Sequence, residues 1–205
     1  MKDSDRRPTV YGTVKNILAH LGSPEERKSA AANLAALRNS AGKEYEEASE
    51  VWPILFPFIP MEFTGKGSAT REEKAVYVTL QLYAIGQQGT NKIINTDNRY
   101  LSMGASLRAI RGSDSKALDR RFNTMITATT FEEFVYHLRQ IYKLGKSSNG
   151  FAVNFPQLGN DLYWYQNGEN RQVCLKWAKD YYQFINNSAE SLPEDSGSKD
   201  NQEVI

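Results

Sequence analysis

Lysine and arginine side chains gather in one segment of the chain, where they could bind phosphate groups. Residues 99–146 hold nine of these cations against four acids, whereas residues 1–50, 51–98 and 147–187 are each charge-balanced. This segment therefore supplies all five excess positive charges of the chain's first 187 residues. A concentrated positive field attracts polyanions, and the formal net charge of +1 for the whole chain conceals it.

The helices predicted over residues 99–146 determine where these cations point. At 100° per residue, each of three successive helices gathers its apolar side chains on one arc and its cations beside that arc. Asp114 and Asp119 lie near one helix start, where carboxylates favour the helix dipole. The interpretation is a surface that binds phosphate without reading bases, and the alternative is a set of solvated faces with local ion pairs. The cations assigned to this surface are Arg108, Arg111, Lys116, Arg120, Arg121, Arg139, Lys143 and Lys146.

Patterns for catalysis and metal binding are missing from the sequence. The two histidines, His20 and His137, lie far apart, and no HExxH pair, CxxC pair or GxSxG elbow occurs. The single cysteine, Cys174, excludes an internal disulfide framework and fits a reducing cytosol. We therefore expect no enzymatic activity, no cofactor, no bound metal and a cytoplasmic location.

Helix signals recur along the chain and predict an all-α protein of about eight or nine helices in two packed lobes over residues 1–187. Capping boxes begin at Ser23, Thr70 and Thr130, Phe155-Pro156 opens a further helix, and the last helix runs from about residue 170 to 186. Residues 188–205 hold five acids and one lysine, which predicts a disordered acidic tail. The longest apolar stretch, residues 51–63, contains three prolines and is too short to span a membrane.

Four stretches of the sequence together are similar to one known family. They are Trp52-Pro53-Ile54-Leu55-Phe56; Arg120-Arg121-Phe122 followed by Met125-Ile126; Leu138-Arg139-Gln140-Ile141; and Phe155 with Leu158, Asp161, Leu162 and Trp164. A weaker match is the Leu37-Arg38 pair before a glycine turn. In order and spacing, over about residues 34–182, the chain resembles the CasB family, the small subunit of the type I-E CRISPR Cascade complex.

The resemblance implies a non-catalytic protein of antiviral defence. In that family two copies lie along a crescent built on CRISPR RNA, and a basic surface holds separated DNA strands while the R-loop forms. The implied partners are other Cascade subunits, CRISPR RNA, the target and non-target DNA strands, and a second copy of the chain. Carried over by position, the implied nucleic-acid contacts are Arg38, Arg108 or Arg111, Arg120, Arg121, Arg139 and Lys143, with Lys116 and Lys146 as supporting charges.

Two departures from the family pattern are visible, and two other functions stay open. Asn39 follows Arg38, where many relatives have a second basic residue, and the acidic tail is not part of the pattern. One alternative is a helical interaction module that docks its basic face on an acidic protein. The other is a helix-turn-helix regulator, for which residues 111–113 would form the turn.

Overall fold

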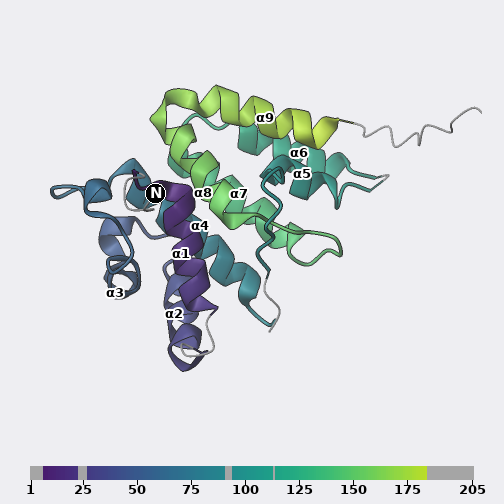
Figure 1. The fold of residues 1–205 in the computed structure, drawn as a ribbon. Coiled ribbons are helices and arrows are strands. Elements are labelled where there is room, and N and C mark those ends of the chain that lie inside the picture. Colours follow the sequence, from purple (N-terminus) through teal and green to yellow (C-terminus); the bar gives the residue numbers. More distant parts are fainter. Residues whose placement is uncertain (1–6, 23–26, 91–93, 113, 184–205) are drawn as a thin grey trace, which may run out of the picture.

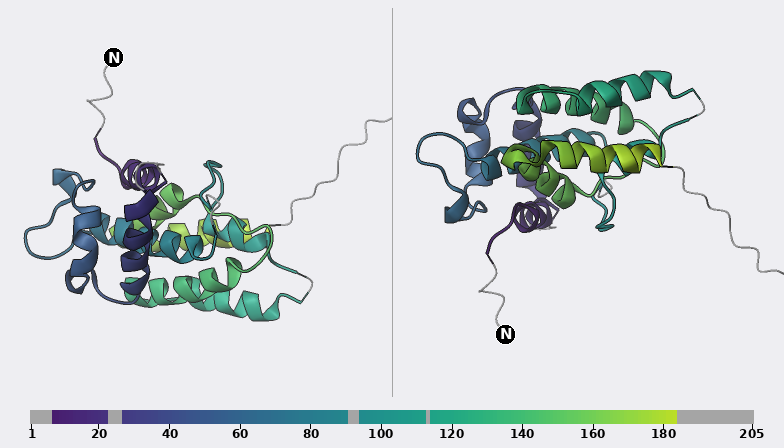
Figure 2. Two further views of the ribbon diagram at one scale, coloured as in Figure 1. Left: turned by 90° about the horizontal axis from the view of Figure 1, so that it is seen from below. Right: turned by 90° about the horizontal axis from the view of Figure 1, so that it is seen from above.

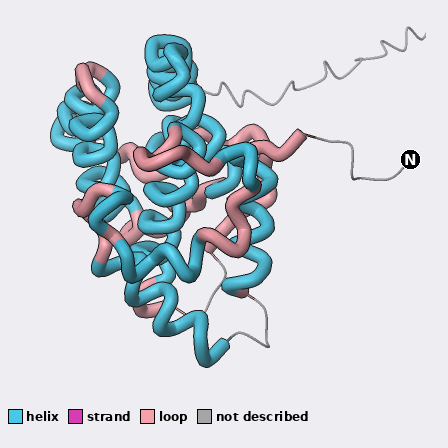
Figure 3. The backbone as a smooth tube through the Cα atoms, turned by 90° about the vertical axis from the view of Figure 1, so that its left-hand side faces the viewer, coloured by secondary structure: helices cyan, strands magenta, loops and turns pink. Residues whose placement is uncertain are grey.

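The computed structural model describes residues 7–22, 27–90, 94–112 and 114–183, and these residues form an all-α protein (Figure 1). Short helical turns connect the longer helices: η2 (Tyr45–Glu47), η3 (Ser49–Val51), η4 (Met61–Phe63) and the π-helical η5 (Tyr165–Glu169). No strand occurs in these ranges (Figure 3), so the predicted all-α bundle is confirmed. The α-helices are α1 (Val10–Leu21), α2 (Arg27–Asn39), α3 (Trp52–Leu55), α4 (Arg71–Gln87), α5 (Met103–Arg108), α6 (Lys116–Ile126), α7 (Phe131–Gly145), α8 (Phe155–Trp164) and α9 (Asn170–Tyr182).

Helix α4 is the centre of the core. Every residue from Ala75 to Ile85 is buried, and α1, α2, α7 and α8 pack around it (Figure 1). A helix that is apolar all round must be enclosed by other helices, as this one is. The buried apolar side chains from α1 to α9 form one continuous cluster.

Local signals in the sequence position most helix starts. The predicted capping box before α4 is present, since the Thr70 hydroxyl accepts from the Glu73 amide and the Glu73 carboxylate accepts from the Thr70 amide. The Thr130 hydroxyl caps α7 by accepting from the Glu133 amide. The Glu133 carboxylate accepts from the amide of Thr129 rather than from that of Thr130. Asn154 caps α8 ahead of Pro156, a residue suited to the first helical turn.

Helices α6 and α7 lie side by side as an antiparallel pair joined by residues 127–130 (Figure 2). Helix α5 packs closely on α9, because Gly104 has no side chain and lies against the backbone of Trp177. The Trp177 indole donates to the carboxylate of Asp161, which ties α9 to α8. The basic segment therefore belongs to two helix pairs, α5 with α9 and α6 with α7.

Some predictions concern residues outside the described ranges. These are the cap at Ser23, the end of the last helix beyond residue 183, and the acidic tail 188–205. The division of residues 1–187 into two lobes stays a prediction. Across the described part of the chain, no helix combines the length and the apolar character needed to cross a bilayer.

Candidate nucleic-acid interface

Helices α6 and α7 pack side by side with their apolar residues buried, and polar residues of both helices line one surface groove. Leu118, Phe122 and Met125 of α6 are buried, as the helical spacing predicted. On α7, the buried side chains include Phe134 and Leu138. Because the helices are antiparallel and close, a groove forms where their outer faces meet.

This α6–α7 groove is open and has a volume of about 340 Å³, and none of the described residues that line it is acidic. Two of its lining residues are the predicted cations Arg120 and Arg121. Neither guanidinium has a hydrogen-bond or ion-pair partner within the described part of the chain, and both side chains are exposed. The described residues that line the groove are Arg120, Arg121 and Thr124 from α6 with Tyr136, His137 and Gln140 from α7.

Tyr136 adds an aromatic surface to the groove that the sequence analysis did not identify. Its side chain is 57% exposed, and its ring lies 5.2 Å from that of His137. The same tyrosine also lines a second cavity, of about 190 Å³, that contains Arg139. The sequence does carry a signal for this position. Tyr136 lies four residues before Gln140, so the two share one face of α7, whereas it lies only two residues before the buried Leu138 and so points away from the buried face.

Two further predicted cations extend the groove at one end. Lys116 precedes Arg120 by four residues on α6, and Lys143 follows Gln140 by three on α7, so each shares a face with a groove residue. Antiparallel pairing places the start of α6 beside the end of α7. Both side chains are exposed and lack an internal partner among the described residues. We call this surface the basic face; its residues are Lys116, Arg120, Arg121 and Lys143.

Arg139 lies apart from the α6–α7 groove and is largely buried. Its Nη2 donates to Gln81 Oε1 of α4 at 2.7 Å, and the Gln81 amide donates to the Ser40 carbonyl at 2.8 Å. Burial lowers the pKa of the Arg139 guanidinium, which nevertheless stays charged as arginines do. Its Nε is buried and has no hydrogen-bond partner among the described residues. Arg139 therefore links α7 to α4 and to the end of α2.

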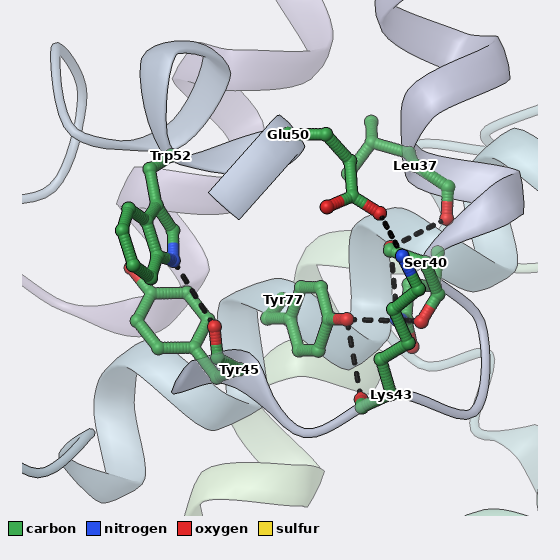
Figure 4. Close-up of polar contacts among 8 residues, drawn as sticks. Leu37, Ser40, Lys43, Tyr45, Glu50, Trp52 and Tyr77 are labelled. Carbon is green, nitrogen blue, oxygen red and sulfur yellow. Dashed lines mark hydrogen bonds and ion pairs between the residues drawn. The ribbon is translucent and has the colours of Figure 1, made fainter. Parts of the chain in front are cut away.

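A polar network fixes the turn that follows α2 (Figure 4). The Tyr77 hydroxyl donates to the carbonyls of Ser40 and Lys43, and Lys43 forms an ion pair of 2.6 Å with Glu50. The predicted contact Arg38 lies in the last turn of α2, just before this network, and is partly exposed. It is not among the residues that line the α6–α7 groove.

Arg111 is held by contacts inside the protein. Its Nε and Nη2 donate to the two carboxylate oxygens of Asp119 at 2.9 and 3.0 Å, and its guanidinium lies 5.5 Å from the ring centroid of Tyr181 and 5.4 Å from that of Tyr182. These hydrogen bonds hold the pKa of Asp119 well below its usual value. Asp119 thus does more than favour the helix dipole.

Arg108 and Lys146 donate to backbone carbonyls. Arg108 Nη1 lies 3.3 Å from the carbonyl of Gln183, next to the end of α9. Lys146 Nζ lies 2.8 Å from the carbonyl of Ile85, in the last turn of α4, where a cation favours the helix dipole. The structure therefore brings four of the nine predicted cations together on the basic face, and gives Arg108, Arg111, Arg139 and Lys146 contacts within the fold.

The histidines and the cysteine lie in separate places. The His20 ring packs on Phe58 at 4.8 Å, whereas His137 lines the α6–α7 groove. Burial raises the pKa of the Cys174 thiol to about 11, which keeps it protonated at neutral pH. Among the described residues, no three His, Cys, Asp or Glu side chains are grouped as metal ligands would be.

The comparisons with known proteins agree with this helical architecture. The family model of CRISPR-associated protein Cse2 matches residues 33–182, which is most of the chain. The chain belongs to this family. Cse2 is also called CasB, and the family is that of a subunit of the CRISPR Cascade complex, so the resemblance seen in the sequence is confirmed.

A solved structure shares the fold. The crystal structure of CasB from Thermobifida fusca matches with a TM-score of 0.63 and 21% sequence identity, over 85% of this chain and 96% of that chain. At this identity the likeness concerns the fold alone. No curated protein matches the sequence significantly.

Proposed function

We propose that this Cse2-family chain is a non-catalytic subunit of a type I-E Cascade complex whose α6–α7 groove binds the phosphate backbone of nucleic acid. The supporting observation is that Arg120 and Arg121 line an open groove. Among the described residues, no acid lines this groove and neither guanidinium has a partner. The planar guanidinium fork matches phosphate oxygens. Tyr136 beside them offers a ring on which an unpaired base can stack.

The biological role follows from the energetics of strand exchange. Replacing a DNA duplex by an RNA–DNA hybrid is nearly balanced in free energy, so a few backbone contacts are enough to favour the open state. We extend the proposal to CRISPR RNA and to both the target and the non-target DNA strands as ligands. A second copy of the chain in the complex, a cytoplasmic location and a role in antiviral defence belong to the same proposal.

The test is the salt dependence of single-stranded DNA binding by the full chain. The four cations of the basic face predict a log-log slope of about −3, since each contact to single-stranded DNA contributes about −0.7. The double variant Arg120→Ala/Arg121→Ala removes two contacts, so we expect the slope to become shallower by about 1.4. Affinity at 0.1 M salt should fall roughly 25-fold.

A matched control removes the same charge from other surfaces. Lys15 of α1 and Arg171 of α9 are exposed and lie outside the groove, so Lys15→Ala/Arg171→Ala should leave the slope within about 0.3 of the parent. If both double variants weaken binding equally, the groove is not the binding site. If the parent shows a slope near zero, nucleic-acid binding itself is refuted. If a complex purified with Arg120→Ala/Arg121→Ala lacks an acidic subunit while the DNA affinity of the variant is unchanged, the protein-docking alternative is favoured instead.

A further inference from the structure

The chain leaves its last described helix directly beside the basic face. The Tyr182 hydroxyl donates to Asn123 Oδ1 of α6 at 2.9 Å, and the Gln183 carbonyl accepts from Arg108. Asn123 lies three residues after Arg120 and seven after Lys116, so all three share one side of α6. The Tyr182 hydroxyl, one residue before the end of the described chain, therefore contacts α6 about one helical turn from Arg120 and about two turns from Lys116.

The sequence that follows has the opposite charge. Residues 184–187 are uncharged, and residues 188–205 contain five acids and one lysine. The basic face holds four cations with no acidic partner among the described residues. Opposite charges in solution attract one another over a Debye length of about 8–10 Å. The positive field of the basic face therefore acts on acids that the chain keeps within that distance.

The intervening chain is long enough to reach. Glu190, the first acid, follows Gln183 by seven positions, and seven steps of about 3.3 Å each span up to about 23 Å. Helix α6 has 11 residues and is therefore about 16 Å long. A ligand tethered over such a distance has an effective concentration in the millimolar range, so weak contacts suffice for occupancy.

We propose that the acidic segment 188–205 occupies the basic face in the absence of nucleic acid and competes with the phosphate backbone for Lys116, Arg120, Arg121 and Lys143. This inference rests on the proposed function. Occupancy by the segment lowers the affinity for isolated strands, and a ligand with a denser array of phosphates displaces it. The segment thus sets a threshold that favours nucleic acid presented at high local concentration, as inside an assembled complex.

The test neutralises the segment in the full chain by the changes Glu190→Gln, Glu194→Gln, Asp195→Asn, Asp200→Asn and Glu203→Gln. We expect single-stranded DNA to bind roughly tenfold more tightly at low salt, because no internal competitor remains. The matched control neutralises five carboxylates elsewhere, which changes the net charge equally and should tighten binding about twofold or less. These are Glu47, Glu62, Glu72, Asp97 and Glu169.

A double-mutant cycle locates the competitor. In the Arg120→Ala/Arg121→Ala background, neutralising the segment should give less than about a twofold gain, since its docking partners are gone. A full tenfold gain in that background, or equal gains from the segment and the control set, would overturn the inference. If the parent and the neutralised chain bind DNA with the same measurable affinity, only the inference fails. If neither binds DNA at any salt concentration, the proposed function fails as well.

Discussion

Asp119 shows how a single acid can remove a cation from a surface. It accepts hydrogen bonds from Arg111, from the Ser115 hydroxyl and from the Tyr181 hydroxyl. Arg111 is thereby held between α6 and the end of α9, next to two tyrosine rings. The charge count of the segment treats this arginine like Arg120, although its donors are directed inward.

We predict that Asp119→Asn lowers the melting temperature. The exposed part of this network is screened by solvent, so the loss is about 1–2 kcal/mol, or roughly 2–8 °C for a chain of this size. Differential scanning calorimetry measures it, and Asp114→Asn, an exposed change just before α6, serves as the control. A variant as stable as the parent would contradict a structural role for the Asp119 network.

The same variant should change the dependence of stability on pH. Because the pKa of Asp119 is lowered in the folded state, the unfolded state binds the proton more tightly. The contribution of Asp119 is therefore complete above its ordinary pKa of about 3.9 and is lost as the pH falls below that value. Between about pH 5 and 3, the free energy of unfolding should fall less steeply for Asp119→Asn than for the parent.

The pairing of α5 with α9 depends on one glycine. A Cβ atom added to Gly104 would lie 2.0 Å from the carbonyl oxygen of Trp177 and 2.7 Å from its carbonyl carbon, and both are backbone atoms that cannot rotate away. The two helices can approach this closely only because position 104 has no side chain.

We predict that Gly104→Ala destabilises the protein by about 1–3 kcal/mol, because α9 must shift to relieve the overlap. The corresponding drop in melting temperature is roughly 2–10 °C. Gly112→Ala is the matched control, since an added Cβ there meets nothing within 4 Å. Equal melting temperatures for the two variants would show that α5 and α9 are not packed as described.

The elements were more predictable than the contacts between them. The capping box at Thr70 and the apolar spacing of Leu118 and Phe122 are local signals, so they predict helices without knowledge of the fold. The partners of Arg139 and Arg111 are set by packing: Gln81 is 58 residues away from Arg139, and Asp119 lies across the connection between α5 and α6. Arg120 and Arg121 are exposed in the structure, but sequence reasoning could not separate them from the cations that have contacts within the fold.

At the scale of the whole molecule, the positive and negative charge excesses lie in different parts of the same chain. The first 187 residues carry an excess of five positive charges, and residues 188–205 an excess of four negative charges. Neutralising the five acids of the segment thus changes the net charge of the whole molecule by five, as well as the charge of the segment. This is why the control set of carboxylates is as important to the proposed test as the segment itself.

The enclosure of α4 has a consequence for how the protein opens. Its residues 75–85 are buried by α1, α2, α7 and α8, so their amides are shielded from solvent as long as all four helices stay in place. Amide hydrogen exchange in α4 should occur only through global unfolding, whereas α6, exposed along one face, should open at lower free energy. Mass spectrometry of deuterium uptake would then find peptides of α4 exchanging last, and faster exchange in α4 than in α6 would contradict its place as the final cooperative unit.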